Sequence, residues 1–227
     1  MSNSNLINRI CSEYEVILAS SSPRRYEILH DVIGIKDLKV MKPDFEEDLD
    51  KSNYVNDPIR YVCDTSYGKA ESIVRSLKNK SDEVNKKKLI VCADTVIIDT
   101  KNKIYEKPQE KEVQLKNLKK FCYEEEYIKV VTSVNIVKWI DADRYDFEPF
   151  YEETKIYFDK NTPLELIEDY VGSEDGLEVA GGFKIQEISG AMIRGIEGDY
   201  YNVVGLPLNR TLTRLISKLD ISSSVII

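Results

Sequence analysis

Residues 16–25 of the chain read VILASSSPRR, and this stretch predicts a strand that turns directly into a helix. Residues 16–19 form a short apolar run of strand length. Three serines follow as a polar turn, and Pro23 suits the first position of a helix that Ser22 caps. The helix is expected to run to about His30. A buried strand followed at once by a helix is typical of an α/β fold.

The rest of the chain continues this alternation of strands and helices. Asp57-Pro58 starts a long amphipathic helix, because apolar residues follow it at helical spacing. Three further helices are expected at residues 111–122, 163–171 and 206–219, strands at 89–99, 127–140 and 153–159, and a surface loop at 141–149. The fold class is therefore α/β. Since no linker divides the chain, residues 1–227 are expected to form one domain with its core at about 14–220.

The composition is that of an ordinary soluble protein, with 42% hydrophobic and 32% charged residues. No stretch approaches the ~20 apolar residues of a membrane helix, so no membrane association is expected. Residues 1–15 lack the apolar core of a signal peptide, which favours a cytoplasmic location. The 4 cysteines are far apart, without a CxxC spacing, and favour buried, reduced thiols over a zinc site or a disulfide framework.

The net charge of −8 argues against a general affinity for nucleic acid or an anionic membrane, which requires a broad basic surface. A small polyphosphate remains compatible with this charge, because it needs only a few cations in one pocket. The chain has 1 histidine, His30, which follows a helical segment and favours a surface or packing role. Acid–base chemistry is therefore expected to fall to carboxylates.

Two stretches carry residues that suit binding and catalysis. The serine turn places Arg24 and Arg25 just inside a helix, where forked donors match phosphate oxygens; an ordinary capped helix with solvated arginines explains the same pattern equally well. Asp94 stands inside an apolar strand, so its charge must be paired or bound to a metal. It is either a structural, hydrogen-bonded aspartate or a carboxylate that holds Mg²⁺ or activates water.

Several motifs together resemble the Maf family, in the family's own order. They are residues 17–25 with Leu29, Lys69-Ala70, residues 93–96, 106–108, 180–186 and 198–208. The chain looks closest to the Maf half of the acetylserotonin methyltransferase-like proteins. The resemblance implies a long curved mixed sheet flanked by helices, with two lobes around a central cleft, similar to inosine triphosphate pyrophosphatase. It allows a homodimer, since members of the family are often dimeric.

The resemblance implies an enzyme that hydrolyses a nucleoside triphosphate to the monophosphate and pyrophosphate with Mg²⁺ or Mn²⁺. An arginine after the Ser-Pro pair, as at Arg24, is similar to the branch that prefers dTTP and UTP and cleans the nucleotide pool. The implied residues are Asp94, Glu178, Lys69 and Lys107 in catalysis; Ser20, Arg24, Arg25, Thr95 and Gln186 in substrate binding; and Glu47 and Asp94 at the metal. The register around Glu47 could equally favour Glu46.

The chain departs from the family pattern at two places. Glu178-Val179 stands where the family usually has Asp-Lys, and Phe183-Lys184 stands where it has Tyr-Gly. The first departure lengthens a carboxylate and removes a cation, which favours a rival hypothesis: a catalytically weak, nucleotide-binding regulator of cell division. A phosphatase that releases orthophosphate is a third hypothesis, because it would use the same cations.

Overall fold

The computed structural model describes residues 5–79 and 86–219. Seven strands form one sheet in the order β2-β1-β3-β5-β6-β7, with β4 paired to β3. The strands are β1 (Glu15–Ala19), β2 (Lys39–Val40), β3 (Lys88–Ile98), β4 (Ile104–Tyr105), β5 (Ile128–Trp139), β6 (Tyr145–Phe158) and β7 (Ile193–Glu197). β1 runs parallel to β2 and β3, whereas β4, β5, β6 and β7 pair antiparallel with their neighbours. The expected α/β class with a long mixed sheet is confirmed.

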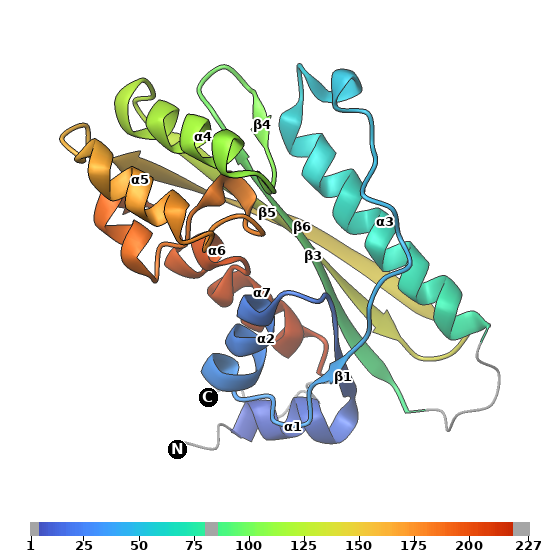
Figure 1. The fold of residues 1–227 in the computed structure, drawn as a ribbon. Coiled ribbons are helices and arrows are strands. Elements are labelled where there is room, and N and C mark those ends of the chain that lie inside the picture. The colour runs from blue at the N-terminus through green and yellow to red at the C-terminus, as the bar shows by residue number, and fades with distance from the viewer. Residues whose placement is uncertain (1–4, 80–85, 220–227) are drawn as a thin grey trace.

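The helices gather in three places around this sheet (Figure 1). They are α1 (Asn5–Glu13), α2 (Pro23–Glu27), α3 (Pro58–Lys78), α4 (Lys111–Tyr123), α5 (Leu164–Gly172), α6 (Tyr200–Val204) and α7 (Leu208–Ser217). α1, α2 and α7 lie together at one end of the sheet, α4 and α5 lie at the other, and α3 lies along the side. The long strands β3, β5 and β6 run through both ends, so the two lobes share one sheet.

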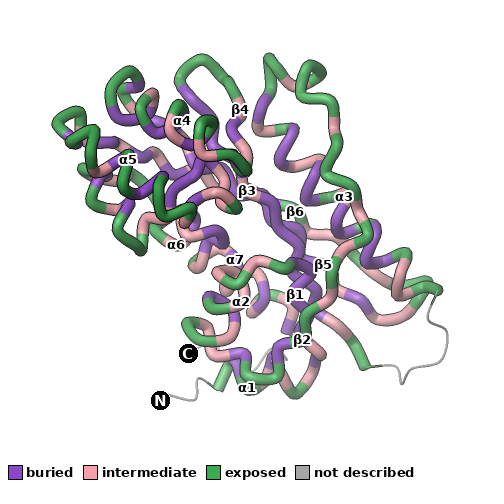
Figure 2. The backbone as a smooth tube through the Cα atoms, in the orientation of Figure 1, coloured by how far each residue is buried: buried purple, intermediate pink, exposed green. Residues whose placement is uncertain are grey.

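The core follows β3 and β5, whose residues are almost all buried (Figure 2). α3 covers one face of these strands with Ala70 and Ile73, and the start of the helix is fixed by Asp57, whose side chain caps Arg60 N as the sequence predicted. No helix within residues 5–79 and 86–219 is long and apolar enough to cross a membrane.

One boundary differs from the sequence prediction. α1 precedes the first strand and packs Ile7 and Ile10 into the hydrophobic core. The surface loop expected at 141–149 is much shorter, because β6 begins at Tyr145. Pro149 lies inside this strand opposite Asn135, and β7 pairs with β6 only from Lys155 onward. The first half of β6 is thus an edge, where a residue without an N–H is tolerated.

The edge of β3 is left uncovered over a few residues, and this gap positions the functional site. β1 ends where Ala19 pairs with Cys92, and β4 first pairs with β3 at Ile97. Neither strand covers residues 93–96 on that edge. Asp94 and Thr95 lie in this gap and face a cleft between the lobes.

Candidate active site

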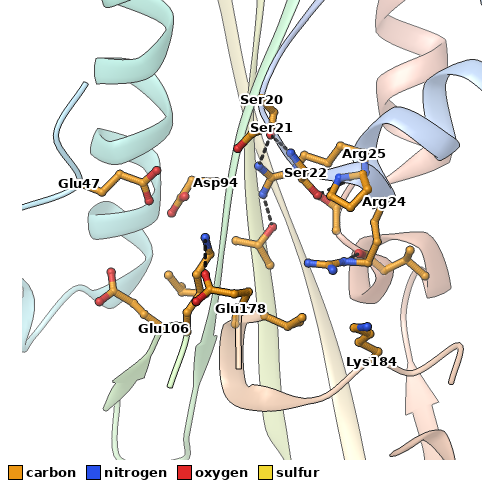
Figure 3. Close-up of a pocket in the computed structure, with 18 of the residues that line it drawn as sticks. Ser20, Ser21, Ser22, Arg24, Arg25, Glu47, Asp94, Glu106, Glu178 and Lys184 are labelled. Carbon is orange, nitrogen blue, oxygen red and sulfur yellow. Dashed lines mark hydrogen bonds and ion pairs between the residues drawn. The ribbon is translucent and has the colours of Figure 1, made fainter. Parts of the chain in front are cut away.

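The cleft has a volume of about 870 Å³ and draws its walls from segments far apart in the sequence (Figure 3). The serine turn and α2 form one wall, and β3 forms the floor at residues 94–97. The cleft is completed by parts of residues 42–47, of the turn after β4 and of residues 174–184. Glu47 and Asp94 lie on one side of the cleft, and Arg24, Arg25 and Lys184 lie on the other.

A buried lysine joins two carboxylates on the first side. Lys69 Nζ of α3 lies 2.7 Å from Asp94 Oδ1 and 2.8 Å from Glu47 Oε1. The side chains of Lys69 and Asp94 are only 9% and 11% exposed, so this pair is formed away from bulk water. Burial raises the pKa of Asp94 above its ordinary value, and the positive charges of Lys69 and Arg25 offset part of that rise. The charge that the sequence placed inside an apolar strand is therefore paired.

The same two carboxylates fit a divalent metal that shares its coordination with a substrate. Mg²⁺ is usually held by one or two carboxylates together with phosphate oxygens and water, not by an all-protein cage. Accordingly, the described residues contain no cluster of three or more potential ligand side chains. Glu47 lines the cleft and faces Lys69, whereas Glu46 does not line it. The geometry thus favours Glu47 of the two alternatives.

Arg25 is a brace between three segments of the chain. Its Nε donates to Gly205 O at 3.0 Å, and its Nη1 donates to Ala93 O at 2.8 Å. The remaining contacts are Nη1 to Ser20 Oγ at 3.2 Å and Nη2 to Thr95 Oγ1 at 2.9 Å. The sequence predicted a substrate-binding arginine here. The structure shows that most of its donors already serve the protein.

Arg24, in contrast to Arg25, makes a single hydrogen bond within the described part of the chain. Its Nε donates to Val204 O at 3.2 Å, and its two terminal nitrogens have no hydrogen-bond partner in the part of the chain that the structure describes. Lys107 and Glu178 also line the cleft, with 3.6 Å between Nζ and Oε2. Both of these side chains are more than half exposed, so they form a rim pair and not a buried one. Arg24 and Lys107 therefore have charges that are open to a ligand.

Gln186 is the candidate that the structure does not bring to the cleft. The resemblance implied that it binds substrate, but its side chain is exposed and is not among the residues that line the cavity. Glu187 N donates to Lys184 O, and Ser189 Oγ both accepts from Lys184 N and donates to Lys184 O. These bonds close a tight turn with Gln186 at its outer tip.

Five charged cleft residues were not predicted from the sequence. They are Lys42, Glu106, Glu174, Asp175 and Lys184. Glu106 accepts a 2.5 Å hydrogen bond from Tyr61 and pairs with Lys51. Glu106 precedes Lys107 in the motif at residues 106–108, which was a signal that it lies at the site. Lys184 stood at a noted departure from the family, whereas the remaining three carried no signal that separates them from surface charges.

Two glycines place the segment that carries Lys184 against the cleft. Gly181 and Gly182 have φ angles of 73° and 84°, in the left-handed region that favours glycine. A Cβ on Gly182 would lie 2.9 Å from the Gln114 side chain, whose Nε2 donates to Gly182 O. The backbone therefore packs tightly on α4 before it turns back to the cleft at Lys184.

The fold and the cleft define a class: an α/β protein with a charged cleft of cations and carboxylates, suited to a phosphorylated small molecule. The chain belongs to the Maf family, whose model, described as Maf-like protein, matches residues 15–218. The resemblance seen in the sequence is thereby confirmed.

Relatives across eukaryotes share this domain. The dTTP/UTP pyrophosphatase of Saccharomyces cerevisiae is 57% identical over 216 residues, covering 93% of both chains. The dTTP/UTP pyrophosphatase of Schizosaccharomyces pombe is 34% identical over 90% of this chain and 84% of its own. A probable bifunctional dTTP/UTP pyrophosphatase/methyltransferase protein of Homo sapiens is 34% identical over 88% of this chain and 31% of its own. The last match agrees with the similarity to the Maf half of methyltransferase-like proteins.

Proposed function

We propose that this protein is a nucleoside triphosphate pyrophosphatase that hydrolyses dTTP and UTP to the monophosphate and pyrophosphate. The observation that carries the proposal is the buried pair of Lys69 and Asp94, joined to Glu47, in a cleft that cations and carboxylates line together. The activity printed for relatives that cover nearly the whole chain supports it. In the cell we propose a role in cleaning the pyrimidine nucleotide pool of the cytoplasm.

The residues of the cleft divide the chemistry between them. Hydrolysis of a phosphoanhydride depends mainly on positioning and on neutralising charge. The Asp94 carboxylate orients a water and accepts its proton as the water oxygen bonds to phosphorus and the α–β bridging P–O bond breaks; pyrophosphate leaves. Lys69, Lys107 and Arg24 offset the phosphate charge. Glu47 and Asp94 would hold Mg²⁺ or Mn²⁺, which supplies further positive charge to the phosphate oxygens.

The rival hypothesis of a catalytically weak regulator rests on the Glu178-Val179 departure. Glu178 is an exposed rim residue, whereas the buried Lys69–Asp94 pair is intact. No observation in the cleft favours the regulator over the enzyme.

The products of hydrolysis test the proposed function. With Mg²⁺ or Mn²⁺, dTTP and UTP are expected to give the monophosphate and pyrophosphate in equal amounts, and EDTA is expected to stop turnover. Separation of nucleotides and of pyrophosphate from orthophosphate by ion-exchange chromatography measures this. Release of orthophosphate with a diphosphate would overturn α–β cleavage in favour of a phosphatase.

A matched pair of variants tests the proposed metal site. Glu47→Gln removes one of the two carboxylates beside Lys69 and is expected to raise the metal concentration for half-maximal turnover by at least about tenfold. Glu46→Gln makes the same change on a neighbouring residue outside the cleft lining, and it is expected to match the parent. The measurement is a titration of turnover with Mg²⁺ at saturating dTTP. Equal behaviour of the two variants would remove Glu47 from the metal site.

A further inference from the structure

The stretch of chain that carries Glu47 is not held by backbone hydrogen bonds. Residues 42–48 follow β2 and run along α3 (Figure 1). Met41 N donates to Leu18 O at 3.0 Å, but residues 42–48 form no backbone hydrogen bond with any residue that the structure describes. Within the same part of the chain, the one ion pair of this stretch joins Glu47 to Lys69. The position of Glu47 therefore depends on the packing of side chains.

The stretch is extended and directs alternate side chains into the cleft. Pro43, Phe45 and Glu47 line the cavity, whereas Asp44 and Glu46 do not. In an extended chain, residues two apart share one face. Phe45 and Glu47 are thus neighbours on the same side of the backbone, and a shift of the Phe45 ring moves the backbone from which Glu47 extends.

The Phe45 ring rests on Gly68 of α3. Met41 and Leu49 pack into the hydrophobic core at the two ends of the stretch, and Phe45 is the only large apolar side chain between them. A Cβ on Gly68 would overlap the ring, with Phe45 Cζ at 2.5 Å and Cε2 closer still. Carbon atoms in contact are normally about 3.5–4.0 Å apart. The ring therefore occupies the space that a side chain at position 68 would need.

Gly68 is unfavourable for the helix that contains it. It lies in the middle of α3, where glycine is destabilising relative to alanine because it loses more backbone freedom on folding. Its φ is not positive, so the backbone itself would accept alanine. The three atoms nearest to an added Cβ all belong to Phe45. The contact with Phe45 is thus the reason that the structure offers for glycine at this position.

Gly68 is followed by Lys69, so consecutive residues of α3 hold the stretch at two points. Gly68 receives the Phe45 ring, and Lys69 Nζ lies 2.8 Å from Glu47 Oε1 and 2.7 Å from Asp94 Oδ1. The carboxylates of Glu47 and Asp94 are directed toward one another in the cleft (Figure 3). Mg²⁺ demands near-ideal octahedral geometry, so two carboxylates that share it must be held at a fixed separation.

We propose that Gly68 and Phe45 are positioning residues for the metal: the ring sits in the space left by the glycine and holds Glu47 beside Asp94. The inference rests on the proposed function, since it concerns the metal of the same reaction. Neither residue takes part in the chemistry.

A double-mutant cycle on Mn²⁺ binding tests the proposal without relying on turnover. Electron paramagnetic resonance measures free Mn²⁺ during titration of the protein with the α,β-methylene analogue of dUTP present. Gly68→Ala displaces the ring and Phe45→Ala removes it, so each is expected to weaken Mn²⁺ binding about tenfold. The double variant is expected to bind Mn²⁺ no more weakly than either single variant, because all three lose the same contact. Losses that multiply in the double variant would overturn the proposal, and so would parent-like binding in Gly68→Ala.

Two further measurements separate positioning from other roles of the pair. Gly68→Ala gains helix propensity, so its melting temperature is not expected to fall in step with its Mn²⁺ affinity. In EDTA, the affinity of each variant for the nucleotide analogue is expected to match the parent. A loss in EDTA as large as the loss with Mn²⁺ would show that the ring contacts the nucleotide, which overturns a positioning role toward the metal.

Gly172→Ala is the matched control. Gly172 ends α5, does not line the cleft, and an added Cβ would meet nothing within 4 Å. The same glycine-to-alanine change is therefore expected to leave Mn²⁺ binding unaltered. Failure of the proposed function is distinct from failure of this inference, because the parent would then bind Mn²⁺ and the analogue but release no pyrophosphate from dTTP.

Discussion

Replacement of Asp94 by asparagine is expected to lower the turnover of dTTP at least about 100-fold, the usual cost of losing a general base. Asparagine keeps the size of the side chain and can still accept a hydrogen bond from Lys69, which lies 2.7 Å from Asp94. It cannot take a proton from water, and it is a weaker ligand for Mg²⁺. Steady-state measurement of pyrophosphate release gives the loss, and circular dichroism confirms that the variant is folded.

The same carboxylate has an unusual titration in the metal-free protein. Burial raises the pKa of Asp94, so the group becomes protonated at a higher pH than an ordinary aspartate. A protonated carboxyl neither accepts a proton nor binds a metal. In the metal-free protein the Asp94 carboxyl is therefore expected to titrate at a higher pH than an ordinary aspartate. NMR of the side-chain carboxyl carbons measures this, and Asp94→Asn is expected to lack the titration.

Asp99 provides a control of the same chemistry outside the cleft. It is a buried aspartate near the end of β3 that pairs with Lys120 at 2.6 Å, and its hydrogen bonds bring its pKa below the ordinary value. Asp99→Asn is expected to lower the melting temperature without changing the turnover of the folded protein. Normal turnover in Asp94→Asn would instead show that Asp94, like Asp99, has only a structural role.

The elements with strong periodicity could be predicted from the sequence. Three elements are long and mostly buried where they pack against the rest of the protein: β3, β5 and α3. Their hydrophobic pattern therefore predicts their first and last residues to within a residue or two. The first half of β6 has a weaker pattern, because it is an edge strand in which the alternation of Tyr145 and Phe147 with acids is interrupted at Pro149. Its pairing depends on β5 beside it, which no local signal reports.

The site was predictable only where local chemistry is unusual. A carboxylate within an apolar strand requires a partner, which pointed to Asp94, and the family motif supplied Lys69. Asp175 lies in a chain where 32% of residues are charged, so it does not stand out, and Lys184 is marked only by its departure from the family pattern. Tertiary contacts decide which charges face the cleft: Arg25 reaches Gly205, 180 positions away. Gln186 lies outside the cleft for the same reason, because tertiary contacts set its position.

Replacement of Arg25 by lysine is expected to lower the free energy of unfolding by roughly 2 kcal/mol. A hydrogen bond to a charged group contributes about 1.5–3 kcal/mol, and water in the cleft replaces some of the bonds that are lost. Four acceptors, from the serine turn, β3 and the segment after α6, share this guanidinium. Lysine cannot reproduce the planar fork. The melting temperature of a chain of this size is expected to fall by about 4–8 °C.

Arg24→Lys separates bracing from substrate binding, because the two arginines are adjacent. Arg24 makes one hydrogen bond within the protein, to Val204 O, so its replacement is expected to change the melting temperature little. It is expected to weaken dTTP binding and to reduce discrimination against purine triphosphates, since lysine keeps the charge but loses the fork. Thermal unfolding and nucleotide titration of both variants measure this contrast. If Arg25→Lys has the melting temperature of the parent and loses only nucleotide affinity, Arg25 binds substrate and does not join the three segments.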